Sequence, residues 1–493
     1  MKTSFFQSYF FKRLTEIFLP LTSWLVITLP IWLSPFHPAV VGYFIIFFIL
    51  YFFYKSIKTT YHAVIVYKKI EIYKKINFSK KIKKFFEKNK NPIIHFVIIP
   101  NYKEPIYKLE STIDAIIKND YPDKINLVLA FEEREKMAKE KEKILIKKYH
   151  QNFKNIFITY HKLLPNEVEG KASNQTYAAK FIENFLIKKK INYKNVIVTI
   201  CDADSILPRN YFSYLTYQYL KEKSRIYHFY WAPVLLYNNF WQLPIFVRIQ
   251  STLSSILRLA FLEQKENLIQ ISTYSVSFWL LKQINFWDVD VIPEDWHIHL
   301  QAFFKFGQKV KTMPLYTIVN GDAVYSGGLI KTLINRYQQE KRWAWGASDI
   351  AYGIKKLFTT PKIPFLIKLK KILFIFETHF FWSTSFFILT ISSSIPPLIN
   401  PFFRKTTMGF FLPKISAFIL TLSSLLLIFY IILDITIRKK LKQKINIASL
   451  PLLIIQWYLL PVISFLFSST PALEAQTRLM FRKPIKYKVT EKV

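Results

Sequence analysis

The stretch that decides the fold is Asn195-Val196-Ile197-Val198-Thr199-Ile200-Cys201, which Asp202-Ala203-Asp204 follows without a break. Its uncharged, β-branched residues are typical of a strand. Mg²⁺ prefers oxygen ligands and is often held by one or two carboxylates together with substrate phosphates. A strand that ends on two carboxylates therefore predicts a metal and diphosphate site. In isolation, however, a solvated Asx turn is the commoner origin of an Asp-x-Asp sequence.

Three more strands are predicted upstream, and each is followed by a helical or charged segment. Apolar runs cover residues 93–99, 125–131 and 155–160. Apolar side chains recur at helical spacing over 106–117, and a second helix is predicted over 173–190. Strands that alternate with helices predict an α/β fold with a mostly parallel sheet, whose ligands bind beyond the carboxyl ends of the strands. Asp202 and Asp204 lie at such an end.

Long uncharged stretches indicate a membrane protein. The 493 residues are 51% hydrophobic and 18% aromatic, which is high for an ordinary soluble chain. Residues 17–54 contain no charged side chain apart from His37, and the break at 34–38 divides them into two spans of the length that a bilayer helix needs. Three later stretches are also long enough to cross a bilayer: 378–403, 415–433 and 445–473.

The distribution of lysines predicts which side the central region occupies. Residues 55–90 contain twelve lysines against two glutamates, and cytoplasmic loops carry such an excess. Both ends of the first hairpin are therefore expected on the cytoplasmic side of the cell membrane. The region between this hairpin and the three later apolar stretches is expected to be cytoplasmic as well. Three further crossings would leave the basic tail 478–492 on the opposite side. One stretch is thus re-entrant or interfacial, or contains two crossings, and the sequence leaves these alternatives open.

The net charge and the cysteine content exclude several classes of protein. The formal charge of +37 concentrates beside the apolar spans, where anionic lipid attracts it, so membrane lipid is a better partner than nucleic acid. Cys201 is the only cysteine, so an intramolecular disulfide and a cysteine zinc cluster are ruled out. The predicted organisation has six parts. They are an N-terminal transmembrane hairpin (1–60), a basic cytoplasmic linker (61–92), a cytoplasmic α/β domain (93–350), an interfacial amphipathic segment (351–375), C-terminal transmembrane helices (376–473) and a basic tail (474–493).

Four further polar clusters follow strands or begin helices in the cytoplasmic region. Pro100-Asn101-Tyr102-Lys103-Glu104 follows the first strand, and Gly170-Lys171-Ala172-Ser173-Asn174 places a cation at a helix start, which favours an anion. Pro293-Glu294-Asp295-Trp296-His297 begins a predicted helix that reaches residue 306. The segment 338–346 combines an arginine with indole rings just ahead of the membrane. Taken alone, each cluster has an ordinary explanation. In the same order, these are a surface turn, a helix cap, acidic residues that complement a helix dipole, and a belt of aromatic and basic residues at the membrane interface.

Taken in order, these clusters resemble the signature of the membrane-embedded family-two glycosyltransferases, which include the cellulose, chitin and hyaluronan synthases. Asp202-Ala203-Asp204 is similar to their Asp-x-Asp motif, and Lys171-Ala172-Ser173-Asn174 to their Lys-Ala-Gly-Asn motif. Glu294-Asp295 matches the end of Thr-Glu-Asp, and Gln339-Glu340-Lys341-Arg342-Trp343 matches Gln-x-x-Arg-Trp. The resemblance covers about residues 91–370. It implies that 93–350 is a GT-A-type nucleotide-sugar-binding domain flanked by transmembrane helices.

The resemblance also implies roles for single residues. The expected reaction is an inverting, metal-dependent hexosyl transfer from a nucleoside diphosphate sugar, with a UDP-sugar as donor. Asp295 would be the catalytic base, with Glu294 beside it, and Asp204 with Asp202 would hold Mg²⁺ or Mn²⁺. The other expected contacts are Asn101, Glu104, Glu132 and Lys171 to the donor, and Gln339, Arg342 and Trp343 to the acceptor and diphosphate. The acceptor would be a growing polysaccharide or a lipid-linked molecule, and an oligomer or a secretion partner would complete the assembly.

Three departures from the family signature leave the specificity open. Ala130-Phe131-Glu132-Glu133-Arg134 stands where Asp-Asp-Gly is usual, so the contact of Glu132 or Glu133 with the nucleobase or ribose is uncertain. Pro293 replaces a threonine, and the segment 272–279 replaces a glycine-rich approach to the acceptor pocket.

Two other classes of function compete with the transferase. One is a transporter or membrane scaffold whose cytoplasmic domain binds nucleotide without turnover. The other is a polyanion binder that relies on charge alone. Nucleotide binding without turnover would favour the first, and salt-sensitive RNA binding that survives mutation of Asp204 would favour the second.

Overall fold

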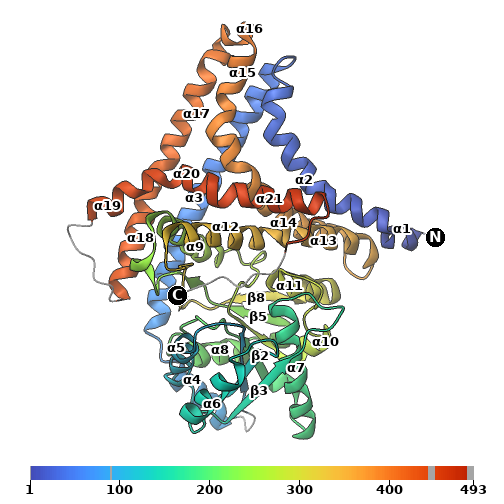
Figure 1. Cartoon of the computed structure of the whole chain (residues 1–493), viewed down its shortest axis with the longest axis vertical. Helices are drawn as coiled ribbons and strands as arrows, with labels where there is room; N and C mark the ends of the chain where they lie inside the picture. Colours follow the sequence, from blue (N-terminus) through green and yellow to red (C-terminus); the bar gives the residue numbers. More distant parts are fainter. Residues whose placement is uncertain (1, 89–91, 442–449, 486–493) are drawn as a thin grey trace.

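The computed structural model describes residues 2–88, 92–441 and 450–485, and it joins an α/β domain to a set of long apolar helices (Figure 1). The main sheet has the order β3-β2-β1-β4-β7-β5-β8. Its strands are β1 (Ile94–Asn101), β2 (Asn126–Glu132), β3 (Asn155–His161), β4 (Val196–Ile200), β5 (His228–Trp231), β7 (Tyr274–Ser277) and β8 (Lys311–Pro314). A small second sheet pairs β6 (Val234–Leu235) with β9 (Val319–Asn320).

The first four strands confirm the predicted parallel arrangement. β2 and β4 are buried over their whole length, which explains their nearly continuous apolar sequence. The register pairs Asn101 with Phe131 and Ile98 with Ile200, so the carboxyl ends of β1, β2 and β4 lie side by side. β7 runs antiparallel to both β4 and β5, which makes the sheet mixed. Periodicity did not predict β5, β7 or β8, because each has only four residues.

The helices of the α/β domain agree with the predicted segments where the sequence singled them out. They include α4 (Phe78–Lys88), α5 (Ile106–Ile117), α6 (Ala138–Tyr149), α7 (Lys171–Lys188), α8 (Tyr211–Lys221), α10 (Phe278–Gln283) and α11 (Glu294–Phe306). α7 packs against β1, β2 and β3, while α10 packs against β4 and β7. The main hydrophobic core lies between these helices and the sheet. Both α7 and α11 begin at a residue that the sequence placed in the site.

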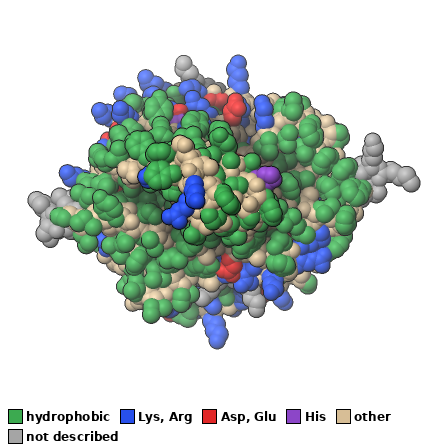
Figure 2. Space-filling view, turned by 90° about the horizontal axis from the view of Figure 1, so that it is seen from above, with side chains coloured by type: hydrophobic (Ala, Val, Ile, Leu, Met, Phe, Trp, Pro, Cys, Tyr) green, Lys and Arg blue, Asp and Glu red, His purple; other side chains and the backbone are tan. Residues whose placement is uncertain are grey.

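Among the residues that the structure describes, five helical segments are long and apolar enough to cross a membrane. The first two are single helices, α2 (Tyr9–Trp32) and α3 (Pro38–Lys74). The third, Phe365–Ile399, contains α14 (Phe365–Ile391) and α15 (Ile395–Ile399), and the fourth, Thr407–Lys440, contains α17 (Thr407–Leu425) and α18 (Leu427–Lys440). The fifth is Pro451–Met480. In Figure 1, α2, α3, α14 and α17 converge toward the end where α15 and α16 (Pro401–Arg404) lie. Seen from that end, the surface is largely apolar, and Lys and Arg lie mainly toward its margin (Figure 2).

The fifth apolar segment has a different direction. It contains α19 (Leu450–Ile455), α20 (Leu460–Ser464) and α21 (Thr470–Met480), which run across the other four rather than along them (Figure 1). α21 packs against α2 and α14 near the base of the helices. The part of the predicted 445–473 stretch before Leu450 lies outside the described residues.

A layer of helices connects the sheet to the long apolar helices. It consists of α9 (Ile245–Phe261), α12 (Leu329–Ala344) and α13 (Ser348–Thr359), with α1 (Lys2–Gln7) at its margin (Figure 1). α9 packs on both β6 and α3, whereas α12 packs on α9 and α21. The layer therefore forms the floor between the carboxyl edge of the sheet and the apolar helices.

Candidate active site

All of the residues predicted for the site line one cavity of about 1080 Å³. The cavity lies between the carboxyl edge of the sheet and the floor formed by α9 and α12. The loops after β1, β2 and β4 reach it, as do the first residues of α7 and α11. The predicted residues that line it are Asn101, Glu104, Glu132, Lys171, Asp202, Asp204, Glu294, Asp295, Gln339, Arg342 and Trp343. The fold thus brings together six segments that lie far apart in the sequence.

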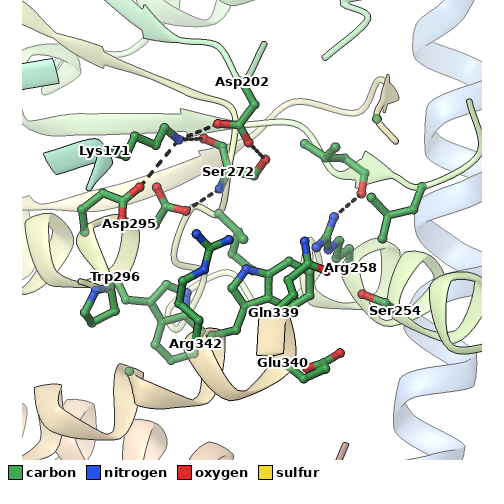
Figure 3. A pocket seen from close by; sticks show the side chains of 18 of the residues that line it. Lys171, Asp202, Ser254, Arg258, Ser272, Asp295, Trp296, Gln339, Glu340 and Arg342 are labelled. Carbon is green, nitrogen blue, oxygen red and sulfur yellow. Dashed lines mark hydrogen bonds and ion pairs between the residues drawn. The ribbon is translucent and has the colours of Figure 1, made fainter. Parts of the chain in front are cut away.

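Lys171 neutralises part of a cluster of carboxylates (Figure 3). Its Nζ lies 2.6 Å from Asp202 Oδ1 and 3.7 Å from Glu294 Oε1. Burial on its own would lower the pKa of the Lys171 ammonium, yet the surrounding carboxylates, first Asp202, raise that pKa well above its ordinary value. Lys171 therefore stays cationic at the start of α7, where the helix dipole adds positive potential.

Asp295 has the properties of a proton acceptor. Its Oδ2 accepts a hydrogen bond of 2.6 Å from the backbone N–H of Ser272, and its Oδ1 is buried without a hydrogen-bond partner among the described residues. Burial raises the pKa of the Asp295 carboxyl, and the neighbouring Glu294 raises it further, while Lys171 opposes the shift. A buried carboxylate with a raised pKa and a free oxygen is suited to general base catalysis near neutral pH.

Ser272 connects these groups, although no role was predicted for it beyond its place in the segment 272–279. Its backbone N–H binds Asp295, its hydroxyl donates to Asp202 Oδ2, and its carbonyl accepts from Lys171 Nζ at 3.1 Å. Ser272 has φ 67°, a left-handed conformation that costs an L-residue about 1 to 2 kcal/mol. That conformation turns the chain just before β7 so that the N–H and C=O face different partners.

Asp204 and Asp322 lie together at another edge of the cavity. Asp204 Oδ2 accepts a hydrogen bond of 3.0 Å from the backbone N–H of Asp322. The Asp322 carboxylate pairs with Lys108, and both side chains line the cavity. No sequence signal marked these two residues, because Lys108 lies within a helix and Asp322 in an irregular loop. They connect the loop after β9 to α5.

The loops after β1 and β2 form a second polar corner of the cavity. Both side-chain polar atoms of Asn101 are buried without a hydrogen-bond partner among the described residues. The guanidinium carbon of Arg134 lies 4.2 Å from the centre of the Tyr102 ring, and Arg134 also pairs with Glu132 at 2.5 Å. Burial raises the pKa of Glu104 to about 7. An unsatisfied amide beside an aromatic and cationic surface is suited to a nucleoside.

The floor of the cavity positions the residues of the Gln-x-x-Arg-Trp segment. Trp343 lies close to two buried arginines, with its ring centre 5.6 Å from the guanidinium carbon of Arg258 and 5.1 Å from that of Arg336. Arg336 also donates to Gln339 Oε1 at 2.5 Å. Arg342 extends from α12 toward Asp295 and Ser272 (Figure 3). The buried arginines therefore fix the indole, while Arg342 faces the carboxylate cluster.

His297 joins the start of α11 to the layer of helices beneath it. Its Nδ1 lies 2.6 Å from Asp349 Oδ1, and its Nε2 lies 2.9 Å from Asp288 Oδ2. Burial alone would lower the pKa of His297, but the carboxylates of Asp349 and Asp288 raise it from its ordinary value near 6.5 to about 10. The imidazolium thus holds α11, and with it Asp295, against α13.

Comparison with known proteins supports glycosyl transfer. Residues 197–433 match the family model described as "Glycosyl transferase family group 2". This match contains Asp202, Asp204, Asp295 and the Gln-x-x-Arg-Trp segment, and together with the observed sheet it confirms the expected mostly parallel, GT-A-like α/β fold. No curated protein matches the chain.

Two solved structures are similar to the chain at low sequence identity. One is the mannosyltransferase PcManGT from Pyrobaculum calidifontis in complex with GDP-Man and Mn²⁺, which is 14% identical, with a TM-score of 0.43 and coverage of 90% of this chain and 100% of that one. The other is GalNAc-T7 with UDP, GalNAc and Mn²⁺, which is 13% identical, with a TM-score of 0.33 and coverage of 59% of each chain.

The left-handed backbone of Ser272 provides a first prediction. Ser272→Gly keeps both backbone contacts and is expected to retain turnover within about threefold, because glycine adopts this conformation without cost. Ser272→Val is expected to lower turnover by at least about 100-fold, because a β-branched residue disfavours positive φ and withdraws the N–H from Asp295. Asn285→Val is the matched control, since Asn285 also has positive φ but lies outside the cavity. Equal turnover by the valine and glycine variants of Ser272 would contradict this role.

The bridge at His297 predicts a pH-dependent stability. Because its pKa is raised in the folded protein, the stabilisation is complete below about pH 6.5 and is lost as the pH rises through about 10. His297→Gln is expected to lower the melting temperature at pH 7 and to flatten its decline toward pH 10. The exposed His150→Gln serves as the control. If His297→Gln has the same melting temperature as the wild type across this pH range, the stabilising role of the His297 bridge is refuted.

Proposed function

We propose that the protein is a membrane-bound inverting glycosyltransferase, which moves a sugar from a nucleoside diphosphate donor, a UDP-sugar in our expectation, to a growing polysaccharide or a lipid-linked acceptor. The observation that carries the proposal is the buried Oδ1 of Asp295, which has no hydrogen-bond partner in the described part of the chain and shares one cavity with Lys171, Arg342 and the Asp202–Asp204 pair. A transferase needs a base for the acceptor and cations for the leaving group, and both are present there.

The residues suggest a single displacement at the anomeric carbon. An acceptor hydroxyl next to Asp295 would lose its proton to Oδ1 while its oxygen forms the new bond to that carbon. The bond from the anomeric carbon to the diphosphate oxygen would break, and the nucleoside diphosphate would leave with the electron pair. Lys171 and Arg342 would stabilise the charge that develops on the diphosphate. Attack from the face opposite the leaving group inverts the configuration.

The carboxylates Asp202 and Asp204 fit a divalent cation in their chemistry. Both line the cavity after β4, and oxygen is the ligand that Mg²⁺ and Mn²⁺ prefer. Among the described residues, no group of three or more His, Cys, Asp or Glu side chains is arranged to hold a metal. The protein would therefore contribute one or two ligands, Asp204 with Asp202 assisting, and the diphosphate would supply the others. When bound, the cation would act as a Lewis acid toward the leaving diphosphate.

We assign the nucleoside of the donor to the corner formed by the loops after β1 and β2. The Asn101 amide has no hydrogen-bond partner there among the described side chains and backbone, Tyr102 offers an aromatic face, and Glu132 is positioned by Arg134. Glu104 accepts a hydrogen bond of 2.5 Å from the backbone N–H of Tyr102 and lines the same cavity as Asp204. The acceptor would occupy the side of Trp343 and Gln339, since indole rings stack on sugars. An oligomer or a secretion partner would be needed only if the product crosses the membrane.

The direction of α19–α21 supports a membrane topology with four crossings. If α2, α3, α14 and α17 cross the bilayer and α19–α21 lies along its surface, the end of α21, with Arg482 and Lys483 after it, lies on the side of the α/β domain. Residues 486–493 of the predicted tail lie outside the described residues. This removes the conflict with the charge rule that three C-terminal crossings would create. We therefore propose that the α/β domain and the basic tail both face the cytoplasm at the cell membrane.

Substitution of the two key carboxylates tests the proposed chemistry. In purified protein supplied with a UDP-sugar and Mg²⁺ or Mn²⁺, Asp295→Asn is expected to lower transfer by about 10² to 10⁴-fold, because the base is lost. Asp204→Asn is expected to raise the metal concentration needed for half-maximal activity. Asp123→Asn, on the exposed surface, is the control.

The pH dependence of wild-type kcat/KM provides a second test of Asp295 as the catalytic base. Because Asp295 must be deprotonated and its pKa is raised, kcat/KM is expected to fall with decreasing pH well before the ordinary carboxyl range near pH 4. The proposed function would be refuted if Asp295→Asn transferred sugar at the wild-type rate. It would also be refuted if neither Asp295→Asn nor Asp204→Asn changed the rate of nucleotide release.

A further inference from the structure

The cavity extends beyond the transfer site to the apolar helices. We call this extension the membrane arm and define it by six apolar lining residues from α9 and α14: Leu253, Leu257, Phe261, Phe374, Phe381 and Trp382. Lys55 and Thr59 of α3 line its far end. Ser254 and Arg258 on α9 also line the cavity, on the side away from Lys171 in Figure 3.

The far end of the membrane arm lies where two helices change from polar to apolar sequence. Lys55 is the first charged residue after the uncharged part of α3, and Glu377 is the last before the uncharged segment 378–403. The two side chains form an ion pair of 2.7 Å across the gap between α3 and α14, and the Tyr51 hydroxyl donates to Glu377. Lys55 and Glu377 retain 39% and 29% of their side-chain exposure. Charged residues at the end of an apolar span mark the level of the lipid headgroups.

From this arrangement we propose that the acceptor is a glycolipid. Its sugar head would lie between Asp295 and Trp343, and its apolar chain would leave through the membrane arm, past the Lys55–Glu377 pair, and enter the bilayer beside α3 and α14. This inference rests on the proposed glycosyl transfer and narrows its acceptor to a membrane-anchored amphiphile whose head carries the reacting hydroxyl.

The apolar character of the membrane arm favours an alkyl chain over a free saccharide. Leu257 exposes 46% of its surface, and it does so into the cavity. An apolar surface of this kind binds a hydrocarbon chain favourably, at about 0.8 kcal/mol for each buried CH₂ group. A free oligosaccharide has no chain to cover that surface, so Leu253, Leu257 and Phe381 would stay in contact with water.

The charges around Asp295 favour a hydroxyl over a phosphate as the reacting group of that head. Asp202, Glu294 and Asp295 are carboxylates within one cluster, and a phosphate oxygen placed beside them would add further negative charge. A phosphate also needs no base, because it is already ionised at neutral pH. A buried base with a free oxygen is useful only for a neutral hydroxyl.

Alkyl glycosides of one disaccharide test the glycolipid acceptor. The full-length protein in nanodiscs is given the donor with the free disaccharide, its octyl glycoside or its dodecyl glycoside, and products are measured by mass spectrometry. We expect kcat/KM to rise at least about tenfold from the free disaccharide to the dodecyl glycoside. Leu257→Trp, which narrows the membrane arm, is expected to reduce the ratio of dodecyl to free-disaccharide transfer by about tenfold.

A matched variant separates binding in the membrane arm from simple partition into the lipid. Leu425→Trp makes the same change at a half-exposed position of α17 outside the cavity, and it should keep the wild-type ratio. Equal transfer to all three acceptors, or the same ratio in both tryptophan variants, would overturn the glycolipid proposal while leaving glycosyl transfer intact. Intact donor with every acceptor would overturn the proposed function itself.

Discussion

The arrangement of the site depends on the burial of one lysine among several carboxylates. Lys171 contacts Asp202 and Glu294 directly, and Ser272 connects the same lysine to Asp202 and Asp295. Removal of one member of a buried charge cluster leaves the others uncompensated, so α7, β4, β7 and α11 are constrained together. Burial raises the pKa of Asp295, and the negative charge of Glu294 raises it further. Arg342 and a divalent metal would balance the excess negative charge of this cluster.

The second constraint is the layer of α9, α12 and α13 between the sheet and the apolar helices. Trp343 is held by Arg258 from α9 and by Arg336 from its own helix, so the floor of the cavity is tied to helices that pack on α3 and α21. His297 ties α11 to α13 in the same way. The candidate site is thereby placed directly against the long apolar helices, and one cavity contacts both the corner that we assign to the nucleoside and the Lys55–Glu377 pair.

Much of the fold and the site could be predicted because short sequence patterns indicate the elements that form them. The β-branched run before Asp202 and the helical spacing over 106–117 predicted the parallel half of the sheet. The order of the motifs along the chain predicted eleven site residues, and all eleven line one cavity. Ser272, Asp322 and His297 were not predicted as contributors, because their roles arise from a left-handed backbone and from contacts between distant segments. The direction of α19–α21 was likewise beyond the sequence, since a surface helix and a crossing helix can have equally apolar composition.

The central claim is that this cavity transfers sugar from a nucleotide donor. The most direct test reconstitutes the protein in nanodiscs with its membrane lipids and a panel of nucleotide sugars, and identifies the released nucleotide and the glycosylated product by mass spectrometry and the anomeric configuration by NMR. The account predicts that one donor is consumed, that nucleoside diphosphate and product form in equal amounts, and that the new linkage has the anomeric configuration opposite to that of the donor. Nucleotide sugars that bind but remain intact, or a product with retained configuration, would contradict it.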